Sequence, residues 1–562
     1  MLRKVVTGVI LIFLSFATAA AAPKPNLVLI TVDSVRADRM GFLGAKGAPT
    51  PNLDRLAAES IVFEHAYSQA PGSVVSHAAI LSGAYPQSAG ISEIGGTLSA
   101  SLPYLPDLLK SQSYRTAAFV GSIALDPQNG LAQGFDRGFQ TYDAGFRGPI
   151  PGDARPPNTE RPGVQVIARA LAWLDHNAQT PGPFFLWINL ADASASGASY
   201  NSAITSVDAA IGRLISVLQQ RNIYGQSAII VVAAHGESLG AHGEATHGIF
   251  LYDETIHVPL LIKLPDGQSL AKTLPSLRVV AKVRLVDIAP TLLEIATIPV
   301  PSQMPGQSLL RVAKAGGNTD QPVYSRSDLS QRGFGWSPLE SWRAGKYLYI
   351  RAPQPELYDL TADPGALHNL ALSSKATLNT MAAQLESFDR RFSSVPTQTS
   401  AELSTSEMQK LASLGYIGLQ KSSGAVAAVA GIDPKDKIAI ANKVIEASTR
   451  DEAKPDRAIA ALIPIVAADP NLYLAQYALG VALARKTQYA EAAKHLHKAI
   501  ELQPDSAWAH YQIGAALLKT GDFKTAIVHL EIAAARLPGF SPAHAALAEA
   551  HKHLGRSEER NN

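Results

Sequence analysis

The sequence predicts an α/β domain followed by an all-helical repeat array. Residues 27–32 are apolar or threonine and rich in β-formers, but they are too few to cross a membrane, which is typical of a strand buried on both faces. A helical pattern follows at residues 50–60 and a second strand pattern begins at residue 61, so strands and helices alternate as they do around an open sheet. Near the carboxyl terminus, prolines recur every 34 residues at Pro470, Pro504 and Pro538, which indicates stacked helical units.

The amino terminus has the features of a signal peptide. In MLRKVVTGVILIFLSFATAAAA two basic residues precede an apolar run and a small-residue cleavage pattern, so we assign residues 1–22 to the signal. An uncleaved membrane anchor is the alternative, because the apolar run approaches the roughly 18 residues that span a bilayer. We therefore expect an exported protein, periplasmic or secreted, with no integral membrane segment after cleavage.

Composition excludes several classes of function. The 562 residues include 49 Lys and Arg against 47 Asp and Glu, and the net charge of +2 offers no electrostatic case for binding nucleic acid. The chain has no cysteine, which excludes disulfides, thiolate metal sites and cysteine nucleophiles. We expect residues 23–395 to form the α/β domain, residues 396–435 a linker, and residues 436–556 the repeats.

Asp33 stands at the end of the first predicted strand. Ligands of open α/β sheets bind just outside the carboxyl ends of the strands, so this carboxylate can face a metal or a reacting group. The alternative is that Asp33 caps the helix that follows, which is the commoner role of an Asp in this position.

Ser73 is predicted on a loop just before an alanine-rich helix. Unpaired N–H groups and the helix dipole favour an anion at a helix amino end, which suits a hydroxyl nucleophile that attacks a sulfate or phosphate ester. The alternative is that the Ser73 hydroxyl simply caps this helix.

Four segments, in this order, resemble the sulfatase family of the alkaline phosphatase superfamily. They are the strand ending in Asp33, the helix TPNLDRLAAES, the loop from Ser73 through His77 into ILSGAYP, and the segment AAHGESLGAHGEATHG at residues 233–248. The resemblance covers about residues 25–395. It implies an alkaline-phosphatase-like sandwich with a central, mostly parallel sheet and a smaller carboxy-terminal sheet at about residues 320–372.

The resemblance also implies the chemistry, a metal-dependent hydrolase or transferase that acts on sulfate or phosphate esters. The implied cofactor is one divalent cation, either Ca, Mg, Mn or Zn. The site residues carried over are Ser73 as the nucleophile, His77 as a substrate-binding residue, and Asp33, Asp192, His235 and His247 as metal ligands.

Several positions depart from the family pattern. Val75 and His77 replace the Pro and Arg of the formylglycine motif, so we expect an unmodified Ser73. Ala234 replaces the Asp that relatives place before His235, and a methyl group cannot bind a cation. The loss of a charged ligand weakens metal binding. A serine-hydrolase triad of Ser73, His235 and Asp192 is disfavoured, because no G-x-S-x-G elbow surrounds the serine.

Two loops are expected over the site. The segment PQSAGISEIGG at residues 86–96 resembles a loop where relatives place His and Asn near the substrate, and here Ala89 and Ile94 stand in those places. The glycine-rich segment at residues 236–248 is expected to be a solvated loop, and the alternative is that it binds substrate. Its other charged or titratable residues are Glu237, His242 and Glu244.

The 34-residue period is the tetratricopeptide signature, with small residues at helix contacts and Pro at unit boundaries. Two full units occupy residues 471–504 and 505–538, with partial units on either side. Such arrays present a concave surface that binds peptides or domains. The alternatives are that this array only packs against the α/β domain or closes a dimer.

Two hypotheses of function remain. In the first, the chain is an exported sulfatase-like hydrolase or transferase whose activity is impaired by the loss at position 234, and whose repeats recruit a protein partner. In the second, the fold has lost its chemistry, and the chain is an inactive binding or scaffold protein that acts through its repeats.

Overall fold

The computed structural model describes most of the chain between the amino-terminal segment and the last residue. The described residues are 24–93, 95–128, 131–145, 161–194, 199–267, 277–315, 320–392, 431–449 and 454–561. The predicted signal peptide and nearly all of the predicted linker lie outside them. None of the helices within these ranges combines the length and the hydropathy that crossing a bilayer requires.

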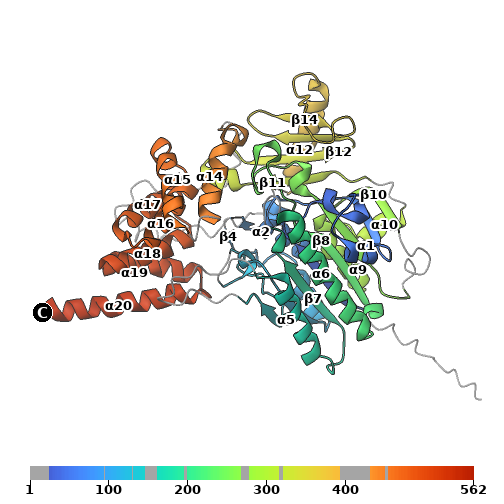
Figure 1. Cartoon of the computed structure of the whole chain (residues 1–562), viewed down its shortest axis with the longest axis horizontal. Helices are drawn as coiled ribbons and strands as arrows, with labels where there is room; N and C mark the ends of the chain where they lie inside the picture. The colour runs from blue at the N-terminus through green and yellow to red at the C-terminus, as the bar shows by residue number, and fades with distance from the viewer. Residues whose placement is uncertain are drawn as a thin grey trace, which may run out of the picture.

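An eight-stranded sheet with the order β10-β2-β9-β8-β1-β7-β5-β6 forms the centre of the α/β domain (Figure 1). Only β9 runs antiparallel to its neighbours, so the other strands end at one edge of the sheet. The strands are β1 (Asn26–Val32), β2 (Ile61–Tyr67), β5 (Arg115–Phe119), β6 (Thr141–Asp143), β7 (Phe184–Leu190), β8 (Ser227–Ala233), β9 (His257–Lys263) and β10 (Leu277–Arg284). The predicted strand that ends at Asp33 is confirmed.

Helices pack on the sheet in two groups, so that every residue of β7 and of β8 is buried. The first group is α1 (Pro51–Ala57), α5 (Gly163–His176) and α6 (Ser199–Gln220), and the second is α2 (Ser73–Ser82), α4 (Leu105–Ser111) and α9 (Ile288–Ile295). The predicted helices at residues 50–60 and after Ser73 are confirmed as α1 and α2. The buried Asp208 of α6 accepts hydrogen bonds from the backbone N–H groups of Asn52 and Leu53, and so joins the amino end of α1 to α6.

The smaller sheet predicted at about residues 320–372 is also present. It has four antiparallel strands in the order β11-β12-β13-β14, namely β11 (Val323–Ser327), β12 (Leu339–Ala344), β13 (Tyr347–Arg351) and β14 (Glu356–Asp359). Helix α12 (Lys375–Phe392) packs on β12 and β13. Together these elements form the second sheet of the predicted sandwich.

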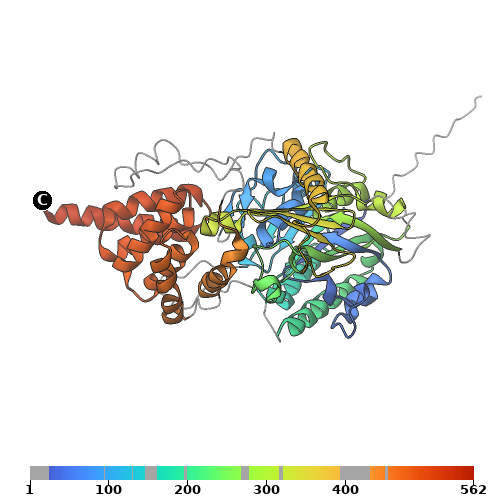
Figure 2. The same ribbon diagram turned by 90° about the horizontal axis from the view of Figure 1, so that it is seen from above.

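The repeat array is all helical and lies to one side of the α/β domain (Figure 2). It contains α14 (Ile438–Thr449), α15 (Pro455–Ala468), α16 (Tyr473–Arg485), α17 (Tyr489–Leu502), α18 (Ala507–Thr520), α19 (Phe523–Arg536) and α20 (Ser541–Asn561). The equivalent Gly480 and Gly514 permit close helix contact, because a Cβ on either would lie 2.6 Å from a leucine Cγ of the paired helix.

One surface of the array packs directly against the α/β domain. Leu474 of α16 contacts Gly333 so closely that a Cβ on that glycine would lie 2.5 Å from a Leu474 methyl carbon. The Gln503 Nε2 donates a hydrogen bond of 2.7 Å to the Arg332 carbonyl. Of the alternatives for the array, packing against the α/β domain is therefore a feature of the structure.

Candidate active site

Asp33 and Ser73 meet at the carboxyl edge of the central sheet. The Ser73 Oγ donates a hydrogen bond of 3.0 Å to the Asp33 Oδ2, and the Asn189 Nδ2 of β7 lies 3.3 Å from the same oxygen. Asp33 is 3% exposed, and its Oδ1 has no hydrogen-bond partner. The carboxylate thus holds the serine hydroxyl and does not cap the helix that follows, whose N-cap is Arg36.

Ser73 does not cap its own helix. The N-cap of α2 is Gly72, and Ser73 is the first residue of the helix, one position later than predicted. The backbone N–H groups of Val74 and Val75 are bound by the carboxylate of Glu93, at 3.3 Å and 2.9 Å. Because Glu93 satisfies the amino end of α2, the partly exposed Ser73 hydroxyl is left to Asp33.

His77 lies beneath Ser73, one helical turn further along α2. Its Nδ1 is 2.7 Å from the Ser73 carbonyl, to which it donates, and its Nε2 is 2.8 Å from the Thr31 hydroxyl. Burial lowers the pKa of His77, which keeps the imidazole neutral. The predicted substrate contact by His77 does not match this geometry, because the enclosed ring is 0% exposed. It orients the first turn of α2 instead.

The rings of His235 and His247 lie side by side at a tilt of 41°, and the two side chains differ in charge. Their ring centroids are 4.3 Å apart, and the His235 Nδ1 donates to the Gly236 carbonyl at 2.8 Å. Burial and the neighbouring His247 hold the pKa of His235 well below its usual value. Burial alone would lower the pKa of His247 too, but the charge of Glu237, whose carboxylate is 3.0 Å from the His247 Nδ1, raises it to about 9.

The loop that carries His247 is packed rather than solvated, so our expectation for it is wrong. Glu237 is 2% exposed and Glu244 is 1% exposed. The Glu244 carboxylate accepts hydrogen bonds from the backbone N–H groups of Ile249 and Phe250, at 2.8 Å and 3.2 Å. Both glutamates therefore have structural partners within the loop, which holds His247 in place.

The Asp192 carboxylate binds the amino end of α5. Both of its carboxylate oxygens lie 2.9 Å from the backbone N–H of Gly163, the first residue of α5. A carboxylate is favoured at the amino end of a helix, both by the hydrogen bond and by the helix dipole. The structure accounts for Asp192 by this contact at the start of α5, and its role as a metal ligand stays a prediction of the family resemblance.

The side chains at the site do not fit the expected divalent cation. Within the described residues, no group of three or more His, Cys, Asp or Glu side chains is arranged to hold a metal ion. Asp33 contributes one unpaired oxygen, while the Nδ1 of His247 is bound to Glu237 and Asp192 lies at α5. Ala234 is fully buried in the apolar core at the position of the missing carboxylate.

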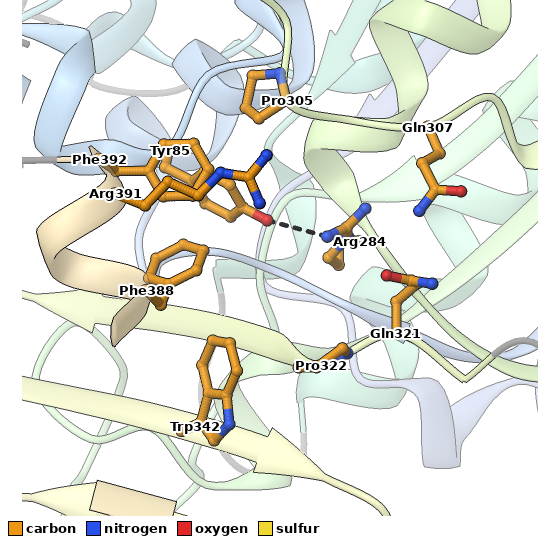
Figure 3. A pocket seen from close by; sticks show the side chains of 10 residues that line it. All are labelled: Tyr85, Arg284, Pro305, Gln307, Gln321, Pro322, Trp342, Phe388, Arg391 and Phe392. Carbon is orange, nitrogen blue, oxygen red and sulfur yellow. Dashed lines mark hydrogen bonds between the residues drawn. The ribbon is translucent and has the colours of Figure 1, made fainter. Parts of the chain in front are cut away.

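A separate cavity of about 290 Å³ lies at the other end of α2 (Figure 3). Its walls include Tyr85, just beyond the carboxyl end of α2, together with Trp342 of β12 and Phe388 of α12. Arg284, at its base, donates hydrogen bonds to the Tyr85 hydroxyl at 3.0 Å and to the Asp287 carboxylate at 2.8 Å. The charge of Arg284 is thereby paired, and Ser73 takes no part in this cavity.

Two residues of the site were missed from the sequence. Asn189 is the only side chain in FFLWINL with two hydrogen-bonding groups, and a lone amide near the end of an apolar strand is a usable signal. Glu93 is the only charged residue of PQSAGISEIGG, the segment that also contains Ala89 and Ile94. An unpaired charge in an otherwise apolar loop beside the predicted nucleophile could have drawn attention to Glu93.

Family models match most of the chain. The model described as Sulfatase matches residues 25–193, and the model described as N-sulphoglucosamine sulphohydrolase, C-terminal, matches residues 242–391. A model described as TPR repeat matches residues 482–521. The chain contains a sulfatase-family domain with tetratricopeptide repeats. A model of type I phosphodiesterase / nucleotide pyrophosphatase also matches the sulfatase-family domain at residues 137–288.

Individual relatives agree with this family. An ulvan-active sulfatase of Formosa agariphila is 26% identical over 404 residues, which cover 62% of this chain and 77% of the relative. N-acetylgalactosamine-6-sulfatase of Canis lupus familiaris is 27% identical over 368 residues, covering 55% and 70%. Their similarity supports a sulfatase-like hydrolase function for the sulfatase-family domain.

Solved structures agree on the fold. Phosphonate monoester hydrolase of Agrobacterium radiobacter matches with a TM-score of 0.54 at 18% identity, covering 66% of this chain and 96% of that structure. A 2-O GAG sulfatase matches with a TM-score of 0.52 at 19% identity, covering 66% and 93%. At these identities the match shows the alkaline-phosphatase-like fold alone.

Proposed function

We propose that this chain is an exported sulfatase-like hydrolase in which the unmodified Ser73 hydroxyl is the nucleophile towards a sulfate or phosphate ester. The observation that carries the proposal is the 3.0 Å hydrogen bond from the Ser73 Oγ to the Asp33 Oδ2, at the amino end of α2. A nucleophilic hydroxyl needs an adjacent base, and Asp33 is placed to be that base. Export rests on the signal-like sequence of residues 1–22.

In the proposed reaction the Ser73 Oγ attacks the sulfur or phosphorus of the ester and passes its proton to Asp33. The bond to the ester oxygen breaks, that oxygen takes a proton from water to leave as the alcohol, and Asp33 returns its proton to solvent. Water then attacks the same sulfur or phosphorus, the bond to the Ser73 Oγ breaks, and the serine hydroxyl regains a proton as sulfate or phosphate leaves. Asn189 steadies the Asp33 carboxylate through its 3.3 Å contact, and neutral His77 holds the Ser73 carbonyl at 2.7 Å. His247, protonated at neutral pH, supplies positive charge for the charge that develops on the ester oxygens.

The family resemblance predicts a divalent cation, but the side chains at the site do not fit one, and no step of this reaction passes through it. If a cation is bound, the unpaired Asp33 Oδ1 is the oxygen placed to meet it. Ala234 and the position of Asp192 argue against a complete set of protein ligands. The metal content of the purified protein is therefore a direct test of this part of the prediction.

A second candidate function is an inactive sulfatase-fold protein that binds partners through its repeats. Ala234 favours it, since the charged metal ligand of relatives has become part of the apolar core. In either case we propose that the part of the array that does not face the sulfatase-family domain binds a protein partner, as concave helical arrays do.

Turnover of aryl sulfate, aryl phosphate and aryl phosphonate esters by the full chain tests the proposal. Ser73→Ala and Asp33→Asn should each lower kcat/KM by a factor of about a thousand or more, as loss of a nucleophile or its base does in other hydrolases. Ser111→Ala is the matched control, because that exposed hydroxyl bonds only to the Leu108 carbonyl. Mass spectrometry of the quenched reaction should find the sulfated or phosphorylated peptide that contains Ser73.

Two outcomes would overturn the proposal. Full turnover by Ser73→Ala would mean that another group is the nucleophile. No turnover and no labelled Ser73 in the native chain, with all three ester classes and with Mg, Ca, Mn or Zn added, would leave the binding protein as the better description.

A further inference from the structure

An anionic group of the chain already occupies the amino end of α2. The two oxygens of the Glu93 carboxylate accept from consecutive backbone N–H groups, Val75 at 2.9 Å and Val74 at 3.3 Å. These are the first donors beyond Ser73 on a helix of ten residues, where unpaired N–H groups and the dipole favour an anion. The proposed ester would present its own anionic oxygens to the same place.

The Glu93 carboxylate occupies the space that a side chain at position 72 would fill. A Cβ built on Gly72 would lie 2.5 Å from the Glu93 Cδ and 2.6 Å from its Oε2, distances that real Cβ atoms do not show. The Gly72 backbone, with φ −147° and ψ 168°, is extended and open to any residue. The absence of a side chain at position 72 is therefore matched to the carboxylate of Glu93 and not to a special backbone conformation.

The charges around Glu93 are mixed. Burial, and to a lesser extent the charge of Asp328, raise the pKa of Glu93 to about 7, while the two N–H groups and the positive His247 act in the opposite direction. Above neutral pH the ionised carboxylate would face any sulfate or phosphate group brought to Ser73. Two anions cannot share the same pair of N–H donors, and each would repel the other.

We propose that Glu93 determines which anions the Ser73 site accepts, because its carboxylate competes with a sulfate or phosphate group for the N–H groups of Val74 and Val75. Tetrahedral anions bind only as the Glu93 side chain withdraws. Esters that recover the lost affinity through the rest of their structure are thereby favoured over free sulfate and phosphate. The inference rests on the proposed function in one respect, that the ester binds beside Ser73.

Binding of inorganic phosphate and sulfate to the full chain tests this competition without any turnover. Titration calorimetry at pH 8 would compare the native chain with Glu93→Gln, which removes the charge, and Gly72→Ala, which keeps the charge but displaces the carboxylate. We expect both variants to bind phosphate at least about tenfold more tightly than the native chain. Glu446→Gln, an equivalent change at an exposed position of α14, is the control and should leave the affinity unchanged.

The two variants remove the competing carboxylate in different ways, so the test can still be made if one of them does not fold. If Glu93→Gln does not fold, Gly72→Ala retains every polar group of the site and still removes the competitor. Native affinity equal to that of the folded variants would overturn the inference, and so would a gain shared by Glu446→Gln.

Phosphate binding and ester turnover by the variants test the role of Glu93 and the hydrolase proposal independently. Tighter phosphate binding by the variants without turnover of any aryl ester would support the competition and refute the hydrolase. Turnover that depends on Ser73, with unchanged phosphate binding in the variants, would support the hydrolase and refute the role of Glu93.

Discussion

A hydrogen-bond motif recurs in the repeat array and predicts the effect of changing His510, where its side chain is buried. At the same position of successive units, a side-chain N–H donates to the carbonyl of the boundary proline. The pairs are Gln476 with Pro470 at 2.8 Å, His510 with Pro504 at 2.9 Å, and His544 with Pro538 at 3.1 Å.

A second atom of the same side chain, the Gln476 Oε1 or the His510 Nδ1, forms a hydrogen bond with a histidine of the next helix. The His495 Nδ1 is 2.8 Å from the Gln476 Oε1, and the His529 Nδ1 is 2.9 Å from the His510 Nδ1. Since the His510 Nε2 must donate to a carbonyl, neutral His510 accepts through Nδ1, and His529 donates. Glutamine at one unit and histidine at the next thus make the same two hydrogen bonds.

His510→Leu should destabilise the array, and His510→Gln should not. Leucine removes the partner of the buried His529 N–H and of the Pro504 carbonyl, and each unsatisfied buried group costs about 1–3 kcal/mol. We therefore expect a loss of about 2 kcal/mol or more from His510→Leu. Glutamine can repeat what Gln476 does one unit earlier, so His510→Gln should cost less than about 1 kcal/mol.

Hydrogen–deuterium exchange of the full chain measures this locally, because peptides from α18 and α19 report opening of the units concerned. His510→Leu should speed exchange in these helices by a factor of about 30 or more, the equivalent of about 2 kcal/mol. Peptides from β1 and β8 provide an internal control. Exchange that is equally fast in the two variants, or unchanged in His510→Leu, would show that the repeated hydrogen bonds do not carry this stability.

Four further results are expected. Burial depresses the pKa of His529 well below its usual value, so the neutral imidazole stabilises the fold fully above pH 6.5. Below pH 6.5 the free energy of unfolding should fall by about 1.4 kcal/mol per pH unit. Denaturant titrations should show this slope in the native chain and not in His529→Asn. Because the pKa of His247 is raised to about 9, its protonated form stabilises the fold fully below pH 6.5, and this stabilisation is lost as the pH rises through 9. Glu237→Gln should lower the pKa of His247 by at least about one unit, as measured by NMR titration. Asp208→Ala should cost about 2–4 kcal/mol in urea denaturation, because it leaves the buried donors at the start of α1 unpaired, and near-native stability would contradict this. Elemental analysis should find well below one equivalent of divalent metal in the purified chain and no further loss in Asp33→Ala, whereas a full equivalent that depends on Asp33 would show that the ligand set has been misjudged.

The elements that were predictable from sequence are those whose pattern is local. The apolar run at β1 cannot be amphipathic in any helix or half-exposed strand, so its burial and the edge position of Asp33 follow together. The 34-residue period reflects a helix pair that cannot bury its apolar face alone, and Gly480 with Gly514 marks the close contact in both units. The family resemblance supplied the second sheet, which no local pattern indicated.

The hydrogen-bond partners of the polar side chains were harder to predict, because they depend on which helix end lies nearest in the folded chain. Asp192 was predicted to bind a metal. It lies at the start of α5, where each of its carboxylate oxygens is 2.9 Å from the backbone nitrogen of Gly163. Ser73 was weighed as a cap, a role taken by Glu93 from a segment that follows the helix. Any carboxylate near the domain surface can satisfy a helix end, and sequence does not say which one will.

The repeats and the candidate site are parts of one packed structure. Asn442, in the first helix of the array, accepts a hydrogen bond of 2.9 Å from the Ala245 N–H and donates one of 2.8 Å to the Gly243 carbonyl. Both groups lie in the loop that carries Glu237 and His247, so the array helps to hold that loop in place. A partner that contacted α14 would therefore lie beside the loop that carries His247. Because coupling between two sites is reciprocal, a partner that shifts α14 would alter the site, and occupation of the site would alter the affinity for that partner equally.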